Sequence, residues 1–121
     1  CENINLWRGA VDRAIEGKRG QAFLRELADV MDAMPNKRLI YGELVTLSGE
    51  VCAIGAVCKA RGLDTSAVDL FDSYHVGEIV GIAGALAAEI EWINDEANLN
   101  PETPEQRWFR VRSWVQGHLK K

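Results

Sequence analysis

The sequence predicts an α+β domain that is mainly helical, with about six helices packed against a small antiparallel β-hairpin or meander. Three observations predict this class: apolar residues recur at helical spacing over most of the chain, β-prone runs flank a Ser-Gly turn near its middle, and no internal repeat divides it. Apolar residues make up 47% of the 121 residues and charged residues 26%, the balance of an ordinary globular chain. We therefore expect one globular domain spanning residues 1–121.

Two helices are predicted in the N-terminal third. Residues 5–16 and residues 20–34 each carry apolar side chains at helical spacing, and Pro35-Asn36 ends the second run. The segment that joins them, Gly17-Lys18-Arg19-Gly20-Gln21, is short and basic. Two helices joined by so short a turn are expected to pack as a hairpin. Two cations and two glycines are more than such a turn requires.

The middle of the chain changes its pattern. Short apolar runs between residues 38 and 53 flank Ser48-Gly49, which predicts a β-hairpin that packs on the helices. Gly55 follows, at the point where the next helix is expected to start. It has two interpretations: an anion pocket at a strand–turn–helix, or a glycine that lets helix and sheet pack closely. The second is favoured.

The C-terminal half is predicted to be helical. Helices are expected over residues 53–60, through Val68, Leu70 and Phe71, over 75–80 and over 83–95. The last helix has the strongest start signal, with Thr103 as N-cap, Pro104 at the first position and Gln106 completing a capping box. The residues expected to form the core include Leu27, Met31, Ile90, Trp108 and Val115.

The cysteines and histidines point to no catalytic or metal site. Three cysteines and two histidines lack the close pairing of a zinc site, so Cys52 and Cys58 are expected to be reduced, buried thiols. A thiol–imidazole pair of Cys52 with His75 has no surrounding motif to support it. We expect a protein that is not an enzyme and needs no cofactor or metal. With no secretion signal and no apolar stretch of membrane-spanning length, we expect it in the cytoplasm.

Residues 76–93 resemble a helix-turn-helix in outline only. The candidate recognition helix, residues 84–91, has no Arg, Lys, Asn or Gln, and Glu89 and Glu91 would be repelled by phosphates. An ordinary helix pair is the favoured interpretation. Residues 61–100 carry eight acidic residues against one basic residue, which is typical of a solvated face; imitation of a nucleic-acid backbone is the alternative.

Both ends of the chain are basic and hold three of the four tryptophans. If the ends meet, they form a basic, aromatic-lined face, and arginine and tryptophan are enriched in binding hot spots. The candidate partner-binding residues are Trp7, Arg8, Lys18, Arg19, Arg107 and Arg110. The alternative is that the tryptophans lie in the core and the arginines form local ion pairs on a solvated rim.

Several phrases resemble a family of small, uncharacterised proteins of tailed phages and prophages. They include Trp7-Arg8-Gly9-Ala10-Val11, Gly17-Lys18-Arg19-Gly20-Gln21-Ala22-Phe23-Leu24, Gly49-Glu50-Val51-Cys52-Ala53-Ile54-Gly55-Ala56-Val57 and Glu102-Thr103-Pro104-Glu105-Gln106-Arg107-Trp108. The resemblance implies a cytoplasmic life inside an infected bacterium. Small phage proteins of this class often bind host proteins, and some inhibit host defence systems.

The leading hypothesis is therefore a non-enzymatic phage or prophage accessory protein that binds a host or phage protein, with inhibition of a host defence system as one role. The first alternative is a nucleic-acid-associated regulator that uses the basic N- and C-terminal segments. The second is a small enzyme of unknown reaction. No membrane partner is expected, and the oligomeric state is left open.

Overall fold

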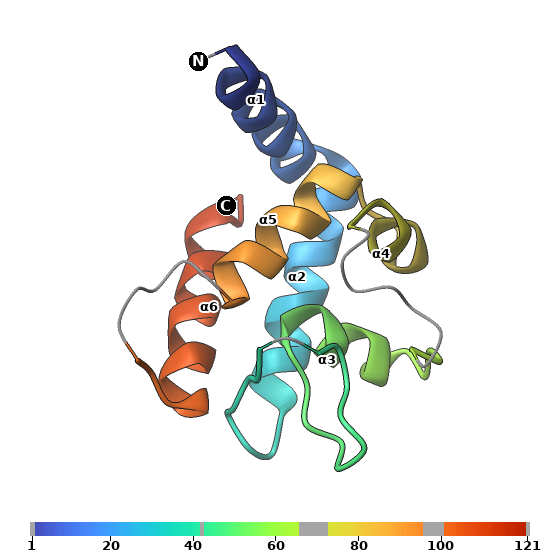
Figure 1. The fold of residues 1–121 in the computed structure, drawn as a ribbon, viewed down its shortest axis with the longest axis vertical. Helices are drawn as coiled ribbons and strands as arrows, with labels where there is room; N and C mark the ends of the chain where they lie inside the picture. The colour runs from blue at the N-terminus through green and yellow to red at the C-terminus, as the bar shows by residue number, and fades with distance from the viewer. Residues whose placement is uncertain (1, 42, 66–72, 96–100, 121) are drawn as a thin grey trace.

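The computed structural model describes residues 2–41, 43–65, 73–95 and 101–120, and in these ranges the fold is all-α (Figure 1). Helix α2 contacts α1, α3 and α6, while α5 contacts α1, α3, α4 and α6. The helices with their bounds are α1 (Glu2–Glu16), α2 (Lys18–Ala33), α3 (Ala53–Ala60), α4 (Ser73–Val80), α5 (Gly84–Asp95) and α6 (Pro104–His118). The helix predicted through residues 68–71 lies outside the described residues.

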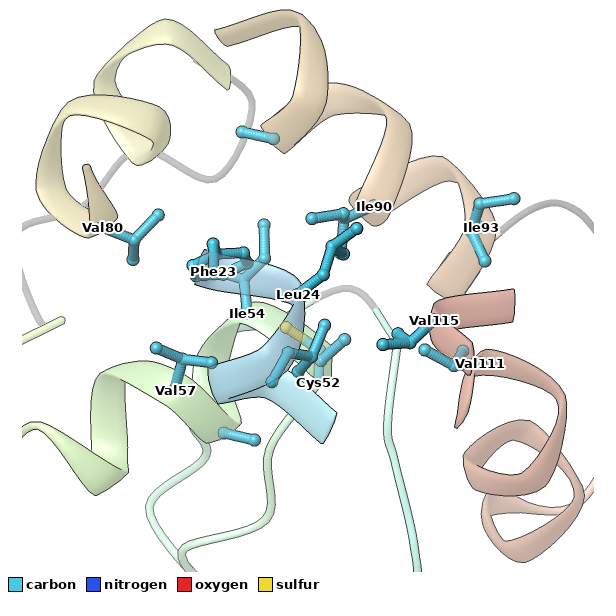
Figure 2. Packing of buried hydrophobic residues seen from close by; sticks show 14 of the residues in the cluster. Phe23, Leu24, Cys52, Ile54, Val57, Val80, Ile90, Ile93, Val111 and Val115 are labelled. Atoms are coloured by element: carbon cyan, nitrogen blue, oxygen red, sulfur yellow. The ribbon is translucent and has the colours of Figure 1, made fainter. Parts of the chain in front are cut away.

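A single hydrophobic core is built from several helices. Side chains of α2, α3, α5 and α6 converge around Leu24 and Ile54 (Figure 2). The core prediction is confirmed, because all five residues expected inside are buried: Leu27, Met31, Ile90, Trp108 and Val115. Burial of such side chains is the main stabilising contribution to a domain of this size.

The predicted β-hairpin is wrong, and so is the α+β class. Within the described residues the segment before α3 forms no strand, only one isolated antiparallel bridge between Val45 and Val51. The turn itself is present, since Gly49 N donates to Thr46 O at 3.0 Å and Thr46 N donates to Glu50 O at 2.9 Å. The segment is therefore a folded loop closed by a tight turn.

Contacts with the helices explain why the loop does not extend into a ladder. The amide of Asn94 donates to Ile40 O at 2.8 Å and its Oδ1 accepts from Ala53 N at 3.0 Å. Leu39 N donates to Pro104 O, and Arg107 Nη1 donates to Leu39 O. Because side chains and the start of α6 satisfy these backbone groups, the loop has less need of a β-partner. A period-two apolar pattern cannot distinguish a loop held this way from a strand.

Gly55 lies where the loop meets α3 most closely. A Cβ at this position would lie 1.8 Å from Leu44 O, a distance that no real Cβ tolerates. Gly55 is buried in the first turn of α3. Gly55 therefore allows close packing of backbones, as the favoured interpretation predicts. The helix packs here on a loop and not on a sheet.

Helix α6 begins as its start signal predicts. Thr103 Oγ1 accepts from Gln106 N at 3.1 Å, and Gln106 Oε1 accepts from Thr103 N at 2.9 Å, so both halves of the capping box are present. Pro104 occupies the first turn. A capping box satisfies two backbone donors that the helix leaves without partners.

Candidate functional site

The basic turn between the first two helices is a sharp corner, not a loop. Only Gly17 separates α1 from α2, and its N–H donates to Arg13 O at 3.0 Å. A Cβ on Gly20 would lie 1.8 Å from Ala14 O, so only glycine allows α2 to start this close to the end of α1. Gly20 therefore has a structural reason to be glycine.

Gln21 joins this corner to the other end of the chain. Its side chain is buried, and its Nε2 donates to Ile15 O at 2.8 Å and to His118 O at 2.9 Å. Its Oε1 accepts from Lys120 N at 2.9 Å. The C-terminal end of α6 is thereby held against the α1–α2 corner, where Figure 1 also places it. The two basic ends of the chain do meet, through one glutamine.

Four cations lie on the last turn of α1, the first turn of α2 and the end of α6; the guanidinium of Arg13 is directed back along α1, with its Nη1 3.1 Å from where a Cβ on Gly9 would be. They are exposed, none forms an ion pair with a described residue, and we call them the basic corner: Arg13, Lys18, Arg19 and Lys120. The Nζ of Lys120 donates to Glu16 O at 2.8 Å. The carboxylates of Asp12 and Glu16 are exposed on α1 close by in sequence. The corner is thus a compact positive site and not an extended basic track.

No ion pair with a described residue explains why Lys18 and Arg19 are positively charged. The last carbonyls of α1 are already satisfied, because Ile15 O accepts from Gln21 and Glu16 O accepts from Lys120. Both cations occupy the first turn of α2, which has no acidic residue and no side-chain cap. A helix dipole disfavours positive charge at that end.

Two of the predicted binding residues, Arg107 and Arg110, lie elsewhere and are held inside the structure. Arg107 is buried, and both guanidinium groups share the carboxylate of Glu102, at 3.3 Å from Arg107 Nε and 2.7 Å from Arg110 Nη2. Arg110 also donates to Ile93 O and Asn94 O at the end of α5. The structure therefore does not bring these two arginines to the basic corner.

Arg8 and Trp7 lie on the outer part of α1, away from the corner. Arg8 Nη1 donates to Glu89 Oε2 at 2.8 Å, joining α1 to α5, and this contact raises the pKa of Arg8. Trp7 is 39% exposed. Trp108 is buried and Trp114 half-buried, so the expected aromatic-lined face does not form as one surface.

The helix pair of residues 76–93 is built for packing. Glu89, on the candidate recognition helix, is buried against Arg8. A Cβ on Gly77 would lie 2.7 Å from Ile82 O, so this glycine lets α4 and α5 approach. Of the acidic stretch, Asp69, Asp72 and Glu96 lie outside the described residues. These contacts favour the ordinary helix pair of the sequence analysis.

The thiol suggested as a nucleophile is buried as the N-cap of α3. Cys52 Sγ accepts a hydrogen bond from Gly55 N at 3.4 Å, and burial raises the pKa of this thiol to about 12. His75, its suggested partner, is exposed on α4. A thiol held in its protonated form is a poor nucleophile at neutral pH.

The described part of the chain contains a large hollow but no cluster of metal ligands. There, no group of three or more His, Cys, Asp or Glu residues is placed to hold a metal ion. No described helix has the length and apolar content to cross a membrane. A hollow of about 490 Å³ lies between the end of α2, the loop and α3, with Val51 and Ala56 buried in its lining and Arg38 and Lys59 on its exposed side.

Sequence analysis missed Gln21 and Glu102 as organising residues. Gln21 contacts residues far away along the chain, and Glu102 shares its carboxylate between two arginines. Neither residue belongs to a local sequence motif. The sequence marks Gln21 only as a polar residue at helical spacing from the apolar residues of the second helix. Glu102 directly precedes the capping box of α6, a position where a carboxylate is ordinarily exposed.

Comparison of the chain with protein-family models, with curated proteins and with solved structures gives no match.

Proposed function

We propose that this protein is a non-enzymatic phage or prophage accessory protein of the bacterial cytoplasm that binds a host or phage protein through its basic corner. The observation that carries the proposal is the pair Lys18 and Arg19. The structure accounts for Gly20 by close approach and for Gln21 by hydrogen bonding, whereas Lys18 and Arg19 form no ion pair with a described residue. Positive charge at the N-terminal end of a helix opposes the helix dipole, and a residue that breaks such a local rule is often a binding residue.

The form of the corner supports a protein partner over a nucleic acid. Of the arginines expected on one basic face, Arg8, Arg107 and Arg110 are ion-paired within the chain, and so is Arg112. Nucleic-acid binding relies on several free cations along a phosphate backbone. A compact group of cations beside Asp12 and Glu16 is better suited to a carboxylate-bearing patch of a protein.

The test reverses charge at the corner. The tagged protein is used to capture partners from the bacterial host, and a captured partner is purified and its affinity measured for Lys18→Glu, Arg19→Glu. We expect a loss of affinity of about tenfold or more, mostly through slower association, with an unfolding temperature close to that of the wild type.

The control is Arg38→Glu, Lys59→Glu, which makes the same change of net charge at the opposite end of α2. Because it also removes the Arg38–Glu105 ion pair and the hydrogen bond from Lys59 Nζ to Gly49 O, its unfolding temperature is measured as well. It should retain the partner. Full affinity of the corner variant, or equal losses in both variants, would contradict the proposal. A steep loss of nucleic-acid binding between low and physiological salt, with no protein partner, would support the regulator instead.

A further inference from the structure

A second hollow, of about 470 Å³, lies between the loop and the start of α6. It is lined by Ile40, Tyr41, Glu43, Thr46, Pro104 and Arg107. This volume falls in the range of sites that hold small organic groups, roughly 300–1,000 Å³. The lining combines an aromatic ring, an aliphatic side chain, a hydroxyl group and one buried guanidinium.

The guanidinium of Arg107 is fixed on one side and available on the other. Its Nη1 donates to Leu39 O at 3.0 Å, and its Nε lies 3.3 Å from Glu102 Oε1. The ring of Tyr41 covers the guanidinium, with its centroid 5.1 Å from Cζ. The Nη2 group makes no hydrogen bond to any described residue. A positioned, buried donor with unused N–H groups is the usual core of an anion site.

Positive charge exceeds negative charge in the cluster behind the hollow. Two guanidinium groups, those of Arg107 and Arg110, share the one carboxylate of Glu102, whose side chain is 8% exposed. The hollow also lies at the N-terminal end of α6, where the helix dipole adds partial positive charge. Glu43, which is exposed, is the only carboxylate among the described residues that line the hollow.

We propose that this hollow binds a carboxylate group, held by Arg107, with its carbon skeleton against Tyr41 and Ile40. One guanidinium charge beside the carboxylates of Glu43 and Glu102 matches one negative charge better than the two of a phosphate monoester. The hydroxyl groups of Tyr41 and Thr46 supply further donors around the hollow. This site is separate from the basic corner, so it stands whether or not the corner binds a protein.

The test compares carboxylates with their neutral amides by ¹H–¹⁵N NMR titration of the wild-type protein. Benzoate is compared with benzamide, and N-acetylphenylalanine with its carboxamide; the first pair represents a free aromatic acid, the second the end of a polypeptide chain. We expect the carboxylates to shift the Arg107 side-chain Nε–H and the amides of residues 40–46, and to bind at least tenfold more tightly than the amides. The carboxylate that binds more tightly shows whether the hollow takes a free aromatic acid or the end of a polypeptide chain.

Variants of the lining separate a binding role from a structural one. Glu43→Gln removes the competing carboxylate and should strengthen benzoate binding several-fold, an effect that a merely structural residue would not produce. Tyr41→Ala should weaken it, as should Arg107→Lys where the spectrum shows a native fold. The matched control, Glu50→Gln, removes a carboxylate that lines the other hollow and should change nothing.

Equal binding of acid and amide, no shift with either carboxylate in the wild type, or an unchanged affinity of the tighter carboxylate in Glu43→Gln would each overturn the proposal. Because Glu43 and Tyr41 are exposed, both variants should fold, so the proposal is decided even if Arg107→Lys does not.

Discussion

Cys52 caps α3 with its sulfur and is fully enclosed by the core. Its pKa of about 12 means that roughly one thiol in 10⁵ is ionised at pH 7. In a Cys1→Ser, Cys58→Ala background, where Cys52 is the remaining thiol, we therefore expect Cys52 to react very slowly with an aromatic disulfide reagent at neutral pH, and to react promptly once the protein is unfolded in denaturant. Rapid stoichiometric labelling of the folded protein would show an accessible thiolate and restore Cys52 as a candidate nucleophile.

Single residues differ in how far their sequence reveals them. Thr103 and Gln106 were predicted as a capping box because the motif is local and its geometry follows from a spacing of three residues. Arg107 and Arg110 were predicted as partner-binding residues of one basic face, and in the structure their guanidinium groups share the carboxylate of Glu102. Whether an arginine is paired depends on residues brought close by folding, which spacing along the chain does not give.

At the level of the elements, α2 is tied to two neighbours by carboxylates at its surface. Glu26 pairs with Arg61 beyond α3, and Asp32 accepts two hydrogen bonds from Arg112 on α6, at 2.8 and 2.9 Å. These guanidinium groups lower the pKa of Glu26 and of Asp32 below their ordinary values of 4.5 and 3.8. The folded state therefore holds these protons less tightly than the unfolded chain does.

We expect the two pairs to make stability depend on acid pH. A carboxyl with a lowered pKa in the folded state contributes stability above its unfolded pKa and loses it as the pH falls, so the free energy of unfolding should decrease below about pH 4.5. Glu26→Gln, Asp32→Asn should cost less than about 1 kcal/mol per pair at pH 7, because both pairs are partly exposed.

The same variant should show a shallower loss of stability in acid, measured by urea unfolding from pH 7 to pH 3. Glu78→Gln is the control, since Glu78 is exposed on α4 and forms no ion pair with a described residue. An acid profile unchanged by the double variant would show that other carboxyls determine it.

Helices were predicted well because each has a stripe of apolar residues at a spacing that no other element uses. The runs at 5–16, 20–34, 53–60, 75–80 and 83–95 correspond to α1, α2, α3, α4 and α5, with ends that differ by a few residues. The loop at 38–53 was assigned to β-structure because its local pattern fits a hairpin. The loop is held by Asn94, which is 54 residues from Ile40, and by Arg107, which is 68 residues from Leu39. A local sequence pattern does not reveal such distant partners.

At the scale of the whole molecule, the two ends of the chain are brought together without their helices packing along one another. The prediction that both ends flank one surface holds at the basic corner only, where α1 and α6 finish. Trp7 and Trp108 lie on parts of these helices that do not share a surface: one is exposed on outer α1 and the other is buried. The candidate site is accordingly smaller than the face predicted from sequence, and it consists of cations that form no ion pair with a described residue.

Gln21 is the residue on which this arrangement depends. Gln21→Ala leaves Ile15 O, His118 O and Lys120 N without the partner that now satisfies them, and the end of α6 loses its attachment to the corner. We expect a loss of about 1–3 kcal/mol in the free energy of unfolding. Amide hydrogen exchange should accelerate at Lys120 and over the last turn of α6, while the middle of α2 changes only in proportion to global stability.

Gln116→Ala provides the comparison, because Gln116 is an exposed glutamine in the last turns of the same helix. It should leave exchange at Lys120 near the wild-type rate. If Lys120 exchanges equally fast in the wild type and in Gln21→Ala, the end of α6 is not held by this side chain, and Lys120 then ceases to belong to the basic corner. The corner would reduce to Arg13, Lys18 and Arg19, and the partner's contact would have to be sought on α1 and α2 alone.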